Sequence, residues 1–296
     1  MKAPIVTVPQ PLPTGLAESI QEDAITSLEH GQVLFFPELT FDSDLLTSES
    51  LWTDSLLDST HKNVSYHHAT QRLGKLNEAN LSEKTADIIK PIMHQYAEFA
   101  MGLVQQICPS YQKDITIGRT SFRPAQIDHR KSSKRKDDTR LHVDAFSASP
   151  VYGKRILRVF TNINPHNIPR VWHIGEPFEN LLDHFAPNIP RYHFLIALIL
   201  KSIKTTKTIR SPYDHYQIYL HDRMKRNDKY QASVEKQRVE FPANSTWMVF
   251  TDQVSHAALS GQFLLEQTFY LPVSAMQQPE LSPLKQWEQL KGKKLA

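Results

Sequence analysis

Apolar residues recur at helical spacing through the first third of the chain. Between 15 and 31 they fall on one helical face, and Gly31 stands where helices commonly end. The same spacing predicts helices at 48–60 and 77–107. The second should be broken near Pro91, because proline removes a backbone donor and crowds the preceding turn.

From about residue 115 the pattern changes to short runs in which apolar and polar positions alternate. Such alternation places the apolar side chains on one face of a strand. An interval at about 176–232 returns to helical spacing, and the alternation then resumes. The expected strands lie in ITIGRTSFRPAQI (115–127), TRLHVDAF (139–146), RILRVFTNINP (155–165), RVWHIGE (170–176), QRVEFPANSTWMVFTDQVSHAAL (237–259) and GQFLLEQTFYLPV (261–273).

Together these patterns predict a mainly β fold with α additions. A mainly helical part at 1–110, holding one buried strand at 32–39, precedes a β-sandwich or barrel core at 115–275 that carries the helical insert at about 176–232. The chain shows no internal repeat and no Gly/Ser-rich linker. Residues 1–296 are therefore expected to form a single domain.

Composition excludes some function classes. Nine glycines stand against nineteen prolines, and neither G-x-G-x-x-G nor a Walker lysine loop is present, which argues against phosphate-cradling nucleotide folds. The single cysteine, Cys108, lies in an apolar helical context and is expected to be a buried thiol. With neither a disulfide nor an N-terminal signal segment, we expect a cytoplasmic location.

The net charge of +3 is too small to indicate nucleic acid by itself. Basic residues cluster in HRKSSKRKDDTR (129–140), but this run lacks interleaved aromatic residues, so no nucleic-acid partner is expected. The run is either a solvated loop or a site for an anionic surface or substrate.

The candidate chemistry begins at His142 and Asp144. On a strand, residues two apart point to the same face, so both side chains can bind one metal ion. His256 follows far downstream, after a second strand and just before a turn at Ser260-Gly261. Two histidines and one carboxylate form the facial triad of non-haem Fe(II) oxygenases, which leaves further positions open. The plain alternative is three polar residues without a shared role.

This arrangement resembles the double-stranded β-helix (jelly-roll) dioxygenases that use Fe(II), 2-oxoglutarate and O2. The resemblance implies a cation that binds the far carboxylate of 2-oxoglutarate, and arginine suits this role because its planar fork bonds both oxygens. Many members carry this cation about ten residues after the distal histidine, but LEQTF (265–269) contains none. Some relatives place it on the strand after His-x-Asp, where this chain has Lys154, Arg155 and Arg158.

Arg155 and Arg158 are an odd number of positions apart, so on a regular strand their side chains point to opposite faces. Only one of them can therefore face the barrel interior. Arg158 is our first choice, because Leu157 and Val159 flank it in mid-strand, where an unpaired charge would be costly. Arg155 is the alternative, and a third possibility is that both pair with surface carboxylates.

Longer stretches are similar to the Kdo hydroxylases of Gram-negative bacteria. They are GRTSFRPAQI, KDDTRLHVDAFSASP, GKRILRVFTNINP, PRVWHIGEPFE, SPYDHYQIYLHDRMK and DQVSHAALSGQFLLEQTFYLP, which lie within about 118–272. The resemblance implies hydroxylation of 3-deoxy-D-manno-oct-2-ulosonic acid (Kdo) at carbon 3, giving Ko, on Kdo-containing lipid A in lipopolysaccharide inner-core biosynthesis. A hydroxylase for another acidic sugar or lipid, and a non-catalytic jelly-roll module that binds anionic glycolipid, remain alternatives.

An anionic acceptor needs cations near the mouth of the site. Arg119, Arg123 and Arg140 are the candidates for substrate binding, although each also fits an ordinary surface charge. A role for His221 or Asp222 in closing the sugar pocket has no support from the pattern, which places them on a packed helix.

A lipid-linked acceptor also needs an approach to the membrane. RYHFLIALILKSIKTTKTIR (191–210) holds seven apolar residues followed by four cations, and it is too short to span a bilayer. It is either a core helix with a basic end or an interfacial helix on the cytoplasmic face of the inner membrane. The sequence leaves the oligomeric state open.

Overall fold

The computed structural model describes residues 4–8, 17–57, 61–74, 83–127 and 133–296. Its strands are β1 (Ile5–Thr7), β2 (Val33–Phe36), β3 (Val64–His67), β4 (Arg72–Gly74), β5 (Thr116–Arg123), β6 (Arg155–Asn162), β7 (Arg170–Ile174), β8 (Gln237–Phe241), β9 (Thr246–Phe250), β10 (His256–Ser260) and β11 (Leu264–Leu271). Its α-helices are α1 (Glu18–Glu29), α2 (Glu83–Ile107), α3 (Phe178–Phe185), α4 (Phe194–Ser202), α5 (Pro212–Arg226), α6 (Asp228–Ser233) and α7 (Pro283–Lys291).

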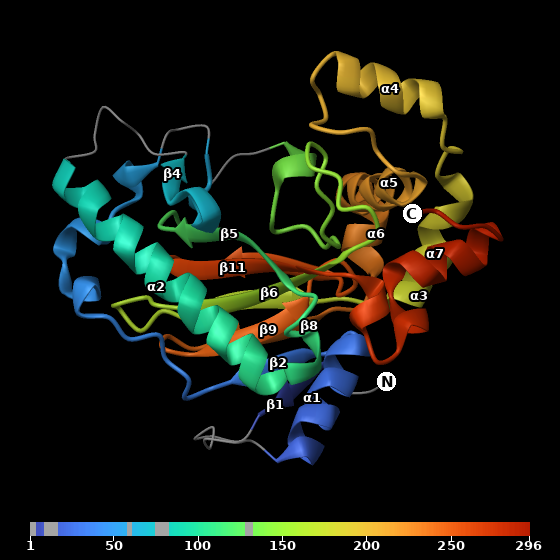
Figure 1. Ribbon diagram of the computed structural model, residues 1–296. Coiled ribbons are helices and arrows are strands. Elements are labelled where there is room, and N and C mark those ends of the chain that lie inside the picture. The colour runs from blue at the N-terminus through green and yellow to red at the C-terminus, as the bar shows by residue number, and fades with distance from the viewer. Residues whose placement is uncertain (1–3, 9–16, 58–60, 75–82, 128–132) are drawn as a thin grey trace.

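Within the described residues, the strands form two sheets (Figure 1). The larger sheet has eight strands in the order β1-β2-β9-β6-β11-β5-β3-β4, and the smaller has three in the order β10-β7-β8. Neighbouring strands are antiparallel apart from β1 and β2, which run parallel. The expected mainly β, jelly-roll architecture with α additions is confirmed.

Large aromatic side chains join the two sheets. Trp247 of the larger sheet stacks on Phe241 of the smaller one with ring centroids 4.0 Å apart. Phe160 of β6 meets the edge of Trp172 of β7 at 5.1 Å. All four side chains are buried, so the space between the sheets is a packed core rather than an open channel.

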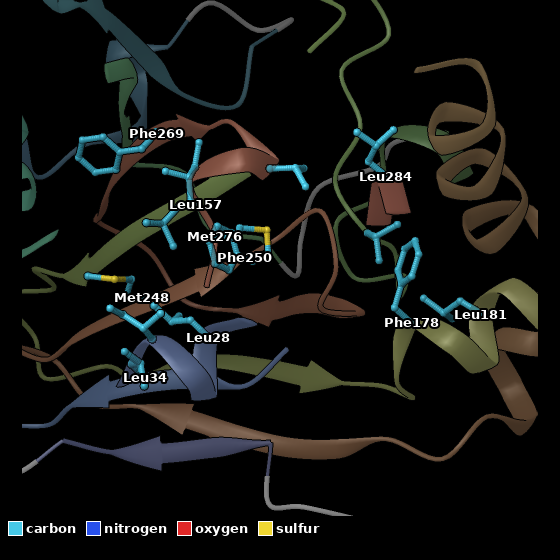
Figure 2. Packing of buried hydrophobic residues seen from close by; sticks show 14 of the residues in the cluster. Leu28, Leu34, Leu157, Phe178, Leu181, Met248, Phe250, Phe269, Met276 and Leu284 are labelled. Atoms are coloured by element: carbon cyan, nitrogen blue, oxygen red, sulfur yellow. The ribbon is translucent and has the colours of Figure 1, made fainter. Parts of the chain in front are cut away.

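The opposite face of the larger sheet is covered by α1 and α2 (Figures 1 and 2). Leu28 of α1 is buried in one cluster with Leu157 of β6, and with Met248 and Phe250 of β9. Every residue of β6 is buried, because this central strand has the second sheet on one side and the helices on the other.

The N-terminal part departs from the prediction in three ways. First, α2 runs continuously through Pro91, since its apolar face packs on the sheet through Ile92, Met93 and Tyr96 and outweighs the lost backbone bond. Second, 48–57 forms short 3-10 turns instead of an α-helix. Third, β3 and β4 extend the large sheet, and the pattern predicted neither. Residues 58–60 and 77–82 of the predicted helices lie outside the described residues.

The later elements agree more closely. The predicted helix at 15–31 and strand at 32–39 correspond to α1 and β2, and the interval at 176–232 contains α3 to α6. The predicted strand at 139–146 is wrong as a regular strand. Only one isolated bridge forms there, and it pairs His142 with His256.

Candidate metal centre

The isolated bridge sets His142 directly opposite His256. The amide of His142 donates to the carbonyl of His256 at 3.0 Å, and the amide of His256 donates back at 2.9 Å. The amide of Asp144 donates to the carbonyl of Thr251, at the end of β9, at 2.7 Å. Three backbone hydrogen bonds therefore bring together residues that are far apart in sequence.

Backbone carbonyls fix the tautomer of both imidazoles. Nδ1 of His142 lies 2.8 Å from the carbonyl oxygen of Arg140, and Nδ1 of His256 lies 2.8 Å from that of Val254. Because a carbonyl oxygen only accepts, each Nδ1 carries the proton and each Nε2 keeps a lone pair. This arrangement is typical of histidines that bind metal through Nε2.

Burial keeps both rings neutral. It lowers the pKa of His142 well below 6.5, and the nearby charges of Lys225, His256 and His221 lower it further. The pKa of His256 is also lowered, chiefly by burial, although Asp144 opposes the shift. Neutral imidazole is the form that binds a metal.

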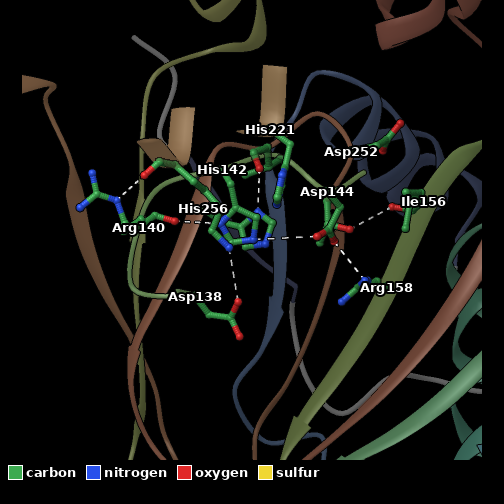
Figure 3. Close-up of polar contacts among 12 residues, drawn as sticks. Asp138, Arg140, His142, Asp144, Ile156, Arg158, His221, Asp252 and His256 are labelled. Atoms are coloured by element: carbon green, nitrogen blue, oxygen red, sulfur yellow. Dashed lines mark hydrogen bonds and ion pairs between the residues drawn. The ribbon is translucent and has the colours of Figure 1, made fainter. Parts of the chain in front are cut away.

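Asp144 completes the set (Figure 3). One ligand atom from each of His142, Asp144 and His256 lies within 4.8 Å of the others. Burial raises the pKa of Asp144, but the Arg158 guanidinium and neighbouring groups hold it below its usual value, so the carboxylate is ionised. Two imidazole nitrogens and one carboxylate match the donor preference of Fe(II), and the residues therefore fit this metal.

Arg158, the first choice from the sequence, lies beside the triad. Its Nη2 is 3.2 Å from Oδ2 of Asp144, and its Nη1 donates to Oε1 of Glu266 at 2.7 Å. Arg123 pairs with the other oxygen of Glu266, and its Nε donates at 2.8 Å. Arg123, a candidate for substrate binding, thus belongs to the same charged cluster as Arg158.

Arg155 points to the opposite face of β6. Its Nε donates to Oδ2 of Asp252 at 2.8 Å, and its Nη2 donates to Oε1 of Gln253 at 2.6 Å. The side chain is fully buried and stacks 3.9 Å over the ring of Phe250. Both of its partners lie away from the triad, so the geometry favours Arg158 for 2-oxoglutarate.

Several buried donors in this region have no hydrogen-bond acceptor among the described residues. They include Nε of Arg158, Nε of Arg170 and Nε1 of Trp172. Trp172 also stacks on His256 with centroids 5.1 Å apart. Burial and the charge of Arg123 lower the pKa of Arg170 to about 9. Unpaired buried donors on cationic side chains indicate a place for an anion.

A small cavity of about 30 Å³ lies beside this cluster. Its lining includes Arg123 and Arg170, together with Lys62, Gln126 and Asp138. Sequence reasoning missed Arg170 and Glu266, because neither stands near the His-x-Asp motif. Their only sequence signal is a charge inside an apolar strand, where a charged side chain needs a partner.

The remaining candidates lie nearer the surface. Arg119 is exposed on β5. Arg140 donates to Oδ1 of Asp228 at 2.6 Å and also to the carbonyl of Lys225. In the basic run at 129–140, Lys134 pairs with Asp228, while residues 128–132 lie outside the described residues.

The structure places His221 next to the triad, which the pattern did not predict. Its ring centroid is 5.4 Å from that of His142 and meets it edge-on. Nδ1 of His221 lies 3.0 Å from Oδ1 of Asp222. Helix α5 therefore forms one wall of the metal centre.

A two-histidine, one-carboxylate centre set against the sheets of a jelly roll, with arginines beside it, defines a non-haem iron, 2-oxoglutarate-dependent dioxygenase. The model of the 3-deoxy-D-manno-oct-2-ulosonic acid (Kdo) hydroxylase family matches residues 14–294. The chain belongs to this family.

Solved structures agree with the family assignment. The chain is 42% identical to the Kdo hydroxylase KdoO in complex with α-ketoglutarate and Fe(III), with a TM-score of 0.93, covering 99% of this chain and 98% of that one. The structure of KdoO with cobalt(II) gives the same identity and TM-score and covers 99% and 97% of the two chains. No curated protein matches the chain at a significant level.

Proposed function

We propose that this protein hydroxylates Kdo at carbon 3 to give Ko, on Kdo-containing lipid A, using Fe(II), 2-oxoglutarate and O2. The observation that carries the proposal is the triad, whose two Nε2 atoms and one carboxylate converge beside unpaired arginine donors. Family membership supports the sugar, and the KdoO complex with α-ketoglutarate supports the co-substrate.

His142, Asp144 and His256 would hold the iron. When iron, 2-oxoglutarate and O2 are bound, they supply the oxidation: 2-oxoglutarate loses CO2 and takes up one oxygen atom as succinate, and the other oxygen enters the C–H bond. The backbone bonds to the two Nδ1 atoms orient the imidazoles, so that little motion is needed when the metal binds.

Arg158 is the residue that we propose for the carboxylate of 2-oxoglutarate, with Arg170 and Trp172 as further donors. Their unpaired N–H groups would each gain an acceptor when a dianion binds. Arg123 would stay paired with Glu266 and hold Arg158 in place. The stacked aromatic residues between the sheets exclude water from this side.

Arg119 and Arg140 are proposed to meet the anionic acceptor at the rim. Since Kdo-containing lipid A is anchored by acyl chains, the protein would act as a peripheral protein on the cytoplasmic face of the inner membrane. Neither arginine is needed for iron binding, so substitution at these positions should raise KM for the acceptor and leave 2-oxoglutarate affinity unchanged.

An anaerobic titration with Fe(II) and 2-oxoglutarate tests the proposal first. A weak visible charge-transfer band should appear in the parent and be absent in His142→Ala. Mass spectrometry of Kdo-lipid A after aerobic turnover should then show one added oxygen. A folded, iron-loaded parent that gives no band would refute the assignment of the triad. A band without an oxidised sugar would refute only the acceptor.

A further inference from the structure

Helix α4 exposes its apolar side chains on almost every face. The exposed fractions are 56% for Phe194, 70% for Leu195 and 57% for Ile199, and Ile203, just beyond the helix, is 64% exposed. Ala197 is the one buried residue of α4. A contiguous apolar surface of this kind is unusual on a soluble protein and marks a site of interaction.

The stretches of chain on either side of α4 carry only positively charged side chains. No acidic residue occurs between Asp183 and Asp214 in the sequence. The same stretch holds the cations Arg191, Lys201, Lys204, Lys207 and Arg210, and the three lysines are exposed. Apolar residues with a cationic border complement the acyl chains and headgroups of an anionic bilayer.

The position of α4 links it to the metal centre. Figure 1 shows α4 as the outermost element beyond α5, on the side away from α1. The connection between α4 and α5 is held on the segment that follows Asp144: the amide of Lys207 donates to the carbonyl of Ala148 at 2.9 Å, and Nη2 of Arg210 donates to that of Ser147 at 2.7 Å. Helix α5 then carries His221 to the triad.

We propose that α4 and the connection as far as Arg210 are a membrane-docking surface that inserts shallowly among anionic phospholipids. With nine residues, α4 is about 14 Å long and would lie in the plane of the interface. Among the described residues, no helix is long and apolar enough to cross a membrane. The inference rests on the proposed function, because a lipid-linked acceptor explains why the docking surface is connected through α5 to the metal centre.

Vesicle flotation tests the docking surface. The parent should float with phosphatidylglycerol/phosphatidylcholine vesicles and bind pure phosphatidylcholine much more weakly. Leu195→Asp/Ile199→Asp should lower the affinity for anionic vesicles on the order of 30-fold or more, since two inserted side chains are lost. Both residues are exposed, so the variant should remain folded.

A matched variant controls for the added charge. Ile168→Asp/Leu290→Asp introduces the same two carboxylates at residues that are 40% and 50% exposed and lie in the loop between β6 and β7 and in α7. It should bind anionic vesicles within about 3-fold of the parent, a loss much smaller than that expected from two inserted side chains. Equal loss of binding in both variants, or none in the α4 variant, would overturn the proposal.

Sedimentation separates a bilayer from a protein partner. The parent and the α4 variant should have the same mass in solution. A parent dimer that the α4 substitutions dissociate would assign the surface to a second copy and overturn the proposal. Because flotation reads binding alone, failure of the parent to hydroxylate Kdo-lipid A would count against the proposed function and not against the docking surface.

Discussion

Arg155 and Arg158 lie on the same strand, but substitution of Arg155 should lower stability, whereas substitution of Arg158 should weaken 2-oxoglutarate binding. Arg155 is fully buried, and its guanidinium bonds Asp252 and Gln253 at 2.8 and 2.6 Å. Arg155→Met keeps most of the volume and leaves the Asp252 carboxylate buried without its cation. Removing one partner of a buried ion pair costs about 3–5 kcal/mol. A change of 1 kcal/mol shifts Tm by roughly 2–4 °C in domains of this kind, so Tm should fall by about 10 °C.

Arg158→Met should mainly weaken 2-oxoglutarate binding and should have a smaller effect on stability. Glu266 keeps Arg123 as a partner at 2.8 Å, so the loss of stability should be smaller than for Arg155→Met. A charge-assisted hydrogen bond to the co-substrate contributes about 1.5–3 kcal/mol, and its removal should weaken 2-oxoglutarate binding by roughly 10- to 100-fold.

The assay measures thermal unfolding and anaerobic 2-oxoglutarate affinity on both variants and on Arg155→Met/Asp252→Leu. The double variant should recover most of the stability, because no unpaired charge remains. Loss of 2-oxoglutarate affinity in Arg155→Met, with Tm unchanged, would refute the argument from strand parity.

Three further outcomes follow from the contacts. His256→Ala should abolish Co(II) binding in a calorimetric titration, and retained binding would contradict the triad. Glu29 is buried and accepts from the Tyr111 hydroxyl at 2.6 Å and from two backbone amides, so Glu29→Ala should lower the free energy of unfolding by about 3 kcal/mol in a urea titration, and a loss below 1 kcal/mol would contradict this. The depressed pKa values of His142 and His256 mean that, as pH falls through about 6.5, the unfolded chain takes up protons at these two residues more readily than the folded chain does. The free energy of unfolding of the metal-free protein should therefore fall as pH drops below about 6.5, with these two residues contributing up to about 2.7 kcal/mol per unit, and a flat profile down to pH 5.5 would contradict the shifts.

The metal ligands were predictable because local geometry determines them. His142 and Asp144 are two residues apart, and His256 follows a strand whose apolar pattern is clear. An extended backbone suffices to turn the first two side chains to one side. A regular strand at 139–146 is therefore not needed, because the single bridge between His142 and His256 already holds the backbone extended at this point.

The charged cluster was not predictable, because it depends on strand order. Glu266 meets Arg158 and Arg123 only because β11 lies between β6 and β5. Arg170 reaches the same cavity from the second sheet. Strand order depends on packing across the whole core, and a single sequence carries little local trace of it. Pro91 shows the same effect in α2, where tertiary packing overrides a local signal.

The two faces of the central strand β6 have different roles: one contributes to stability and the other to the metal centre. Both faces of β6 are buried, so each arginine on the strand needs a partner for its charge. The kind of partner shows which role that arginine has. Arg155 has a closed set of partners that leaves nothing for a ligand, whereas Arg158 keeps a buried Nε without an acceptor. A shift of β6 by one residue would exchange the two faces, placing an uncompensated charge against α1 and α2 and removing the cation beside Asp144. The apolar residues that fix the register of β6 therefore also fix the position of the arginine beside the metal centre.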